Sequence, residues 1–172
     1  MHSDPFPPGA RVGTYEVRRP LSAGGNAQVF VAWDPALHRE VALKILSGHA
    51  LGDPDRLARI EREARVLAQL SHPNILQVID LVRWQDQPVV VTELLEGRTL
   101  RARLAEGALP LPQALELIHQ VASALEVVHR KGIIHRDIKP ENLFLTSEGR
   151  CKVLDFGLAK SLEPEEGQVL GE

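Results

Sequence analysis

The chain has 172 residues, of which 44% are hydrophobic, and carries a formal net charge of −3. This length suits one domain or two small lobes, and the weak negative charge argues against nonspecific binding of nucleic acid. The single cysteine, Cys151, excludes an internal disulfide, and no apolar run approaches the ~20 residues of a membrane span, so we expect a cytoplasmic protein without a membrane segment.

The first half of the sequence is typical of a small antiparallel sheet. Residues 1–13 are rich in proline and glycine, and we expect them to form a flexible lead-in. After them, short runs of apolar and β-branched residues alternate with turn signals. One helix is predicted after Asp53-Pro54-Asp55, where apolar residues from Leu57 to Leu70 recur at three- and four-residue steps. The five predicted strands lie near residues 15–17, 29–32, 41–45, 75–81 and 89–94.

After residue 97 the pattern changes from strands to helices. A short helix is followed by a longer one, in which apolar residues from Leu115 to Val128 recur at helical spacing. We therefore expect an α+β protein of two lobes, with a strand-rich lobe at residues 14–96 and a helical lobe at residues 97–172. Clefts between two lobes are favoured ligand sites.

Lys44 and Glu63 are charged residues on apolar faces. Strand alternation puts Lys44 on the same face as Ala42 and Leu46, where an ammonium group needs an anion nearby. Glu63 lies on the apolar side of its predicted helix and needs a cation. A Lys44–Glu63 pair satisfies both residues, although each of them alone is explained as well by a side chain that reaches from the edge of its face to water.

The segment from Ser22 to Val29 connects the first two strands and contains Gly24, Gly25 and Ala27. A chain that approaches a triphosphate with its backbone N–H groups must lack bulky side chains, and this segment meets that requirement. A hairpin turn without any ligand is an equally common explanation of the same residues.

Four residues that suit phosphate and magnesium chemistry lie near the end of the sequence. Asp137, Lys139 and Asn142 fall within one run that a proline keeps out of a helix, and Asp155 follows an apolar strand. A carboxylate accepts the proton of an attacking hydroxyl, and a lysine screens charge on a transferring phosphoryl group. Asparagine and aspartate oxygens suit a hard cation such as Mg²⁺. The pattern indicates a phosphoryl-transfer site, because a merely structural charged turn above a packed His135 explains neither the full motif nor the second group at Asp155.

In order and spacing these motifs resemble the protein kinase family, in particular its Ser/Thr type, over about residues 14–171. The resemblance implies a two-lobe kinase-like fold, ATP and Mg²⁺ as cofactors, and a protein Ser or Thr hydroxyl as substrate. Lys139 is typical of Ser/Thr kinases rather than tyrosine kinases. The motifs are Val41-Ala42-Leu43-Lys44, Glu63 ahead of His72-Pro73-Asn74-Ile75, His135 to Asn142, and Asp155-Phe156-Gly157.

The resemblance also implies roles for single residues. Lys44 would hold the α- and β-phosphates and pair with Glu63. Asp137 would orient or deprotonate the substrate hydroxyl with Lys139 beside it, and the metal ligands would be Asn142 and Asp155. Around the nucleotide, the resemblance implies Ser22, Gly24, Gly25, Ala27, Val29, Ala42, Lys44, Thr92, Glu93, Leu95 and Phe144. Among these, Val29, Ala42 and Phe144 would sandwich the adenine ring, Thr92 would be the gatekeeper, and Glu93 to Leu95 would be the hinge whose backbone hydrogen-bonds adenine. The stacked regulatory spine would consist of Leu67, Val78, His135 and Phe156.

The chain departs from the family pattern in two respects. Ser22 and Ala27 stand where the loop usually has glycine, so we expect weaker phosphate cover. The sequence also ends within the expected activation loop, so the long helix should expose apolar surface, and we expect a poorly soluble or partly molten chain unless self-association or a partner covers it. A catalytically impaired ATP-binding or regulatory fragment is therefore the alternative function. A small-molecule kinase with a related cleft fits Lys139 less well.

Overall fold

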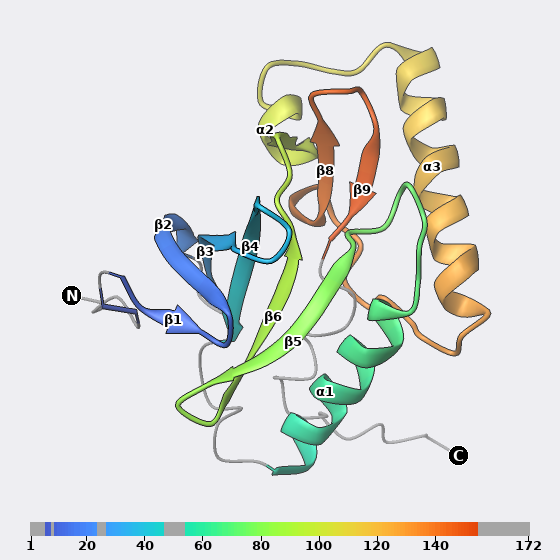
Figure 1. The fold of residues 1–172 in the computed structure, drawn as a ribbon. Helices are drawn as coiled ribbons and strands as arrows, with labels where there is room; N and C mark the ends of the chain where they lie inside the picture. Colours follow the sequence, from blue (N-terminus) through green and yellow to red (C-terminus); the bar gives the residue numbers. More distant parts are fainter. Residues whose placement is uncertain (1–5, 8, 24–26, 47–53, 155–172) are drawn as a thin grey trace, which may run out of the picture.

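The computed structural model describes residues 6–7, 9–23, 27–46 and 54–154 (Figure 1). Its N-terminal part is a six-stranded antiparallel sheet in the order β1-β2-β3-β4-β6-β5. The helix α1 (Pro54–Ala68) packs against β5 and β6. The strands are β1 (Arg11–Val12), β2 (Tyr15–Ala23), β3 (Ala27–Asp34), β4 (Arg39–Leu46), β5 (Val78–Trp84) and β6 (Gln87–Glu93).

The sheet has six strands rather than the five predicted, because part of the N-terminal segment adds an edge strand. β1 pairs with β2 through Val12 and Tyr15. Phe6 is buried, and its ring packs edge-on against Phe30 and Trp84, with centroids 4.7 and 5.4 Å apart. The sequence predicted a flexible lead-in. In the structure, aromatic burial and strand pairing instead hold the described residues before Tyr15 against the sheet.

The sheet curls until its two edges meet. The hydroxyl of Tyr15 in β2 donates to Oδ2 of Asp80 in β5, at 3.2 Å. Burial, and then the nearby Asp80 carboxylate, raise the pKa of Tyr15 to about 12. A side chain at Gly13 would meet Val82 of β5, with a Cβ only 3.2 Å from its Cγ1, and the φ of +60° at Gly13 also favours glycine.

Two element boundaries differ from the predicted ones for local reasons. β5 begins at Val78 rather than near Ile75, because Ile75 forms an isolated parallel bridge with Val153 and leaves the sheet. The turn between β5 and β6 lies at Gln85 and Asp86, whose φ angles are 48° and 66°. Two positive φ angles are typical of a tight hairpin turn, so β6 begins at Gln87, two residues earlier than predicted.

The C-terminal part holds α2 (Leu100–Leu104), α3 (Leu111–His129) and a three-stranded sheet in the order β7-β8-β9. Its strands are β7 (Gly97–Thr99), β8 (Leu143–Thr146) and β9 (Cys151–Val153), with the 3₁₀ helix η2 (Pro140–Asn142) ahead of β8. β7 escaped prediction because it is three residues long and begins with Gly97. A Cβ at Gly97 would lie 2.1 Å from the carbonyl oxygen of Leu145, so only glycine permits this pairing.

A shared core joins the two parts. Buried residues of α1, β5 and β6 pack in one cluster with α3 and the β8–β9 hairpin. A second cluster covers the other face of the larger sheet. The first cluster includes Ile60, Leu67, Val78, Val90, Val121, Val128 and Val153, and the second includes Phe6, Phe30, Val41, Leu43, Ile45, Val89 and Val91.

The outer face of α3 is apolar and exposed. Leu111, Leu115 and Ile118 are 71, 57 and 61% exposed. This confirms the expectation of uncovered apolar surface on the long helix. Among the described residues, no helix is both long and apolar enough to cross a membrane.

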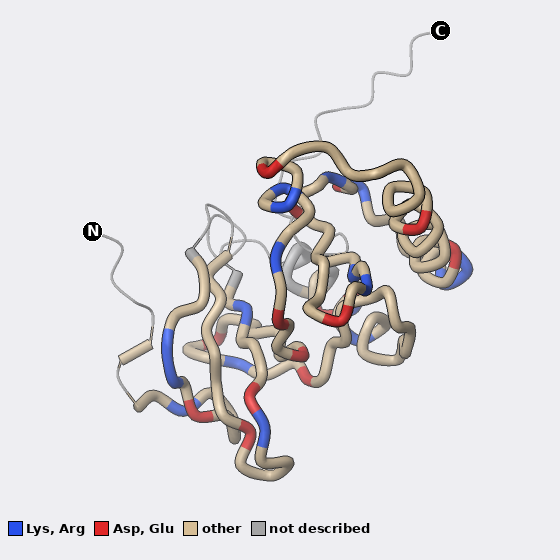
Figure 2. The backbone as a smooth tube through the Cα atoms, turned by 90° about the horizontal axis from the view of Figure 1, so that it is seen from above, with Lys and Arg blue, Asp and Glu red and all other residues tan. Residues whose placement is uncertain are grey.

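Charged residues of both signs are interspersed along the backbone (Figure 2). Several form exposed ion pairs, as Arg98 does with Glu106 and Arg130 with Glu126. Such pairs contribute little to stability, and they leave the surface charge mixed.

Candidate active site

Strand register gathers four predicted nucleotide-site residues on one face of the larger sheet. Val29 of β3 lies opposite Lys44 of β4, and Ala42 of β4 lies opposite Thr92 of β6. Residues directly opposite each other, or two apart on one strand, share a face. The pairing of Lys44 with Val90, a member of the α1 cluster, shows that this face is the one toward α1.

Glu63 lies on the buried side of α1, as the sequence predicted. Its helical neighbours Ile60, Ala64 and Leu67 are buried, and Glu63 itself is half-buried. Lys44 is also half-buried and belongs to the sheet face toward α1. The Lys44–Glu63 pair stays a prediction, and these positions are the ones it requires.

His135 fixes the loop that carries Asp137. The imidazole is 1% exposed, with Nε2 2.6 Å from the carbonyl oxygen of Leu154 and Nδ1 3.2 Å from the backbone nitrogen of Asp137. A carbonyl only accepts and a backbone N–H only donates, so Nε2 carries the proton and Nδ1 accepts. One buried ring therefore ties the backbone at Asp137 to the end of the strand that leads to Asp155.

Asn142 and Lys139 both contact Asp137. The Asn142 Nδ2 donates to the Asp137 carbonyl oxygen at 2.8 Å and to its Oδ2 at 3.0 Å. Lys139 Nζ lies 2.8 Å from the same Oδ2. Because the amide of Asn142 uses its N–H groups in these bonds, its Oδ1 is the atom that suits a hard cation. The structure thus brings three sequence-predicted residues into one cluster.

The second predicted metal ligand, Asp155, lies outside the described residues. Leu154, just before it, is held from both sides, since its N–H donates to the Asn142 carbonyl oxygen at 2.8 Å and its own carbonyl accepts from His135. Phe156, Gly24 and Gly25 also lie outside the described residues. Within the described part, no three His, Cys, Asp or Glu side chains gather in a group that could bind a metal.

Arg136 adopts a left-handed backbone conformation with a φ of 64°. For a residue other than glycine or asparagine this conformation is strained, and such strain clusters at functional sites. The strained residue stands between His135 and Asp137, whose hydrogen bond spans it. The hydrogen bond between His135 and Asp137 therefore holds Arg136 in a backbone conformation that a residue of this type does not favour.

Thr92, the predicted gatekeeper, and Glu93, the first residue of the predicted hinge, make contacts that the sequence did not predict. Thr92 is buried and its hydroxyl donates to the Glu93 carbonyl oxygen at 3.2 Å. The Glu93 carboxylate turns toward Gln77 and Lys152, whose backbone N–H and ammonium group lie 2.8 and 2.6 Å from Oε1. The sequence feature that could have indicated the contact with Glu93 is Lys152, a lysine within the otherwise apolar strand β9. Leu95, also predicted to belong to the hinge, is half-buried.

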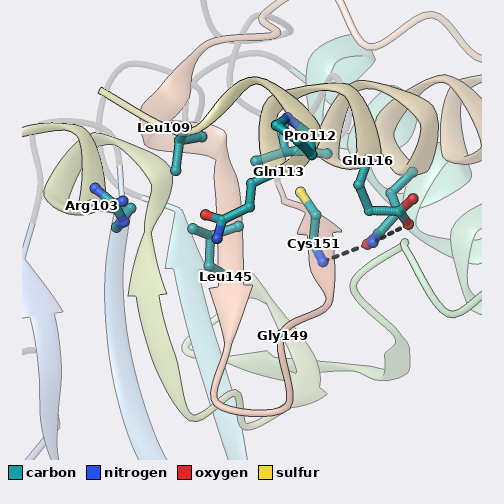
Figure 3. A pocket seen from close by; sticks show the side chains of 10 residues that line it. Arg103, Leu109, Pro112, Gln113, Glu116, Leu145, Gly149 and Cys151 are labelled. Atoms are coloured by element: carbon teal, nitrogen blue, oxygen red, sulfur yellow. Dashed lines mark hydrogen bonds between the residues drawn. The ribbon is translucent and has the colours of Figure 1, made fainter. Parts of the chain in front are cut away.

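Phe144 and a pocket of the described structure lie on opposite faces of the β8–β9 hairpin. Phe144 pairs with Thr99 and Lys152, whereas Leu145 pairs with Cys151. Leu145 and Cys151 line a cavity of about 520 Å³ behind the hairpin (Figure 3). Alternation therefore places this cavity away from the predicted adenine site. The cavity is lined by Arg103, Leu109, Pro112, Gln113, Glu116, Leu117, Gln120, Leu145, Gly149 and Cys151.

Three of the four predicted spine residues are in the core. Leu67 and Val78 belong to one buried cluster, and His135 is buried as well. Phe156, the fourth, lies outside the described residues.

Comparison with known proteins gives consistent matches. The protein kinase domain family matches residues 15–170. Serine/threonine-protein kinase pkn2 of Myxococcus xanthus is 38% identical over 156 residues, which cover 89% of this chain and 19% of that protein. The chain thus spans about a fifth of the length of this curated relative.

Solved structures confirm the predicted kinase-like fold. The PknI kinase domain of Mycobacterium tuberculosis matches with a TM-score of 0.83 and 32% identity, over 90% of this chain and 64% of that one. Rad53 in complex with AMP-PNP matches with a TM-score of 0.73 and 28% identity, over 84% of this chain and 38% of that one. The chain belongs to the protein kinase family.

Proposed function

We propose that this chain is the ATP-binding part of a protein Ser/Thr kinase, which transfers the γ-phosphoryl group of ATP to a Ser or Thr hydroxyl of a protein. The observation that carries the proposal is the cluster of Asp137, Lys139 and Asn142, in which an amide and an ammonium group hold one carboxylate. Catalysis of this kind depends on positioning and on charge neutralisation more than on covalent chemistry.

In the proposed reaction, Asp137 orients the substrate hydroxyl and accepts its proton as the oxygen attacks the γ-phosphorus. The bond from that phosphorus to the β-phosphate oxygen breaks, and ADP leaves. Lys139, 2.8 Å from Asp137, offsets negative charge on the transferring group. Asn142, through Oδ1, and Asp155 would hold Mg²⁺, which neutralises phosphate charge when bound.

The nucleotide would lie between the larger sheet and the β8–β9 hairpin. Val29, Ala42 and Thr92 share the sheet face that carries Lys44, and Phe144 lies on the hairpin. The similarity to a kinase solved with AMP-PNP supports this placement. Glu93 and Leu95 would contact adenine through their backbone, while Ser22, Gly24, Gly25 and Ala27 would cover the phosphates. Because the reaction consumes ATP, we place it in the cytoplasm.

The exposed stripe on α3 favours a second candidate, an ATP-binding fragment with impaired catalysis. The chain covers 64% of the PknI kinase domain, and Leu111, Leu115 and Ile118 are uncovered by the described residues. We propose that a second copy or another polypeptide segment covers this stripe, because apolar patches of this kind favour association.

One experiment separates the two candidates. Mg²⁺-dependent ATP binding and phosphate transfer to a generic basic protein are measured for this chain and for Asp137→Ala. Transfer that Asp137→Ala abolishes supports the kinase, and binding without transfer supports the impaired fragment. Absence of nucleotide binding in the unmodified chain contradicts both.

A further inference from the structure

Lys152 forms a partly buried ion pair with Glu93 of the predicted hinge. Its side chain is 14% exposed, and that of Glu93 is 29% exposed. The Lys152 Nζ donates to Glu93 Oε1 at 2.6 Å and to the Ile75 carbonyl oxygen at 3.3 Å. The neighbouring pair of Arg150 with Glu148 is different, because its side chains are 59 and 77% exposed and 3.9 Å apart.

Glu93 is held by its side chain and its backbone together. Oε1 accepts from the Gln77 N–H at 2.8 Å, and the Glu93 N–H donates to the Gln77 carbonyl oxygen at 3.1 Å. Its carbonyl accepts from the Thr92 hydroxyl. The carboxylate therefore points toward Gln77 and Lys152 and fixes the backbone of the predicted hinge.

Lys152 also stands directly opposite Phe144 across the hairpin. Opposite residues of an antiparallel pair share a face, with Cβ atoms about 5 Å apart. The flanking residues Cys151 and Val153 point to the buried side, so the lysine is the polar exception in β9. The Lys152 residue thus joins two parts of the predicted adenine site. It lies opposite Phe144, which is predicted to contact the adenine ring, and its ammonium group pairs with Glu93 of the predicted hinge.

We propose that Lys152 is a positioning residue for the adenine half of the nucleotide site, acting through Glu93. This inference rests on the proposed function. The ion pair fixes the position of the hinge backbone relative to the β8–β9 hairpin before any ligand binds. The adenine-binding site is therefore preformed. Preorganisation raises affinity because less ordering is needed on binding.

The test compares ligands that contain adenine with one that does not. Dissociation constants for adenosine, Mg²⁺-ADP and Mg²⁺-tripolyphosphate are measured for the unmodified chain, Lys152→Met and the control Arg150→Met. Lys152→Met should weaken adenosine and ADP binding by about 3- to 10-fold, with tripolyphosphate binding changed less than about 2-fold. Arg150→Met, which breaks the exposed pair of the same hairpin, should leave all three constants unchanged.

Glu93→Gln provides an independent variant that keeps the size of the side chain and removes its charge. It should show the same adenine-selective loss, and the double variant should lose little more than either single one, because both remove one interaction. If Lys152→Met does not fold by circular dichroism, Glu93→Gln decides the question alone.

Three outcomes are distinguishable. Failure of the unmodified chain to bind any of the ligands overturns the proposed function. Normal binding by the unmodified chain and by both variants overturns the positioning role of Lys152. Equal weakening of adenosine and tripolyphosphate binding also overturns it, because a purely structural defect affects the whole site.

Discussion

Asn142 holds Asp137 at two points, with its Nδ2 2.8 Å from the Asp137 carbonyl oxygen and 3.0 Å from the carboxylate Oδ2. The first bond fixes the loop backbone and the second fixes the orientation of the carboxylate. Four residues lie between the partners, so one amide closes this loop, which directly follows strained Arg136.

Asn142→Ala should therefore impair Mg²⁺-dependent phosphate transfer, or Mg²⁺-dependent nucleotide binding if the chain does not transfer. We expect a loss of about 10- to 100-fold, since hydrogen bonds to a charged group contribute roughly 1.5–3 kcal/mol. Titration with nucleotide at several Mg²⁺ concentrations measures it. Glu141→Gln changes the exposed neighbour on the same 3₁₀ helix and should have no effect. If Asn142→Ala leaves the Mg²⁺ dependence unchanged, the assignment of Asn142 as a metal ligand is contradicted.

Local periodicity predicted most of the fold, and non-local contacts account for the remainder. Alternation in β4 correctly placed Lys44 on the face opposite Val41, Leu43 and Ile45, because successive strand residues point to opposite faces of a sheet. The burial of Phe6 depends on Phe30 and Trp84, which no local pattern connects to it. Charge on an apolar face predicted the position of Lys44, but the partner of Glu93 lies 59 residues away on β9.

Phe6→Ala tests whether the N-terminal segment is part of the folded sheet. Removing this buried ring leaves a cavity against Phe30 and Trp84, and we expect a loss of about 3 kcal/mol in the free energy of unfolding. Urea unfolding followed by tryptophan fluorescence measures it, because Trp84 contacts the ring. The control Leu37→Ala, at a position 62% exposed, should change stability by no more than about 0.5 kcal/mol. Equal effects of both changes count against a packed segment.

Cys151 makes stability depend on alkaline pH. Burial raises the pKa of its thiol from 9.0 to about 11. Above pH 9 the unfolded chain loses this proton while the folded chain keeps it, so the contribution is complete below pH 9 and declines as the pH rises to about 11. Cys151→Ala should flatten the decline of unfolding free energy in this window. Tyr15→Phe serves as the comparison, since the pKa of Tyr15 is raised to about 12 and its effect begins at higher pH. A decline that Cys151→Ala leaves unchanged would have another source.

The apolar stripe of α3 should drive association in this chain. Leu115 and Ile118 are one helical turn apart and are 57 and 61% exposed, so they present one continuous surface to a partner. We expect sedimentation velocity to show self-association, and Leu115→Glu with Ile118→Glu to shift the chain toward monomer, because burying two carboxylates in an interface is costly. Gln113→Glu adds a negative charge at an exposed position on the opposite side of α3 and should leave association unchanged. A monodisperse monomer with a sharp cooperative melt would show instead that the stripe is tolerated in water without a partner.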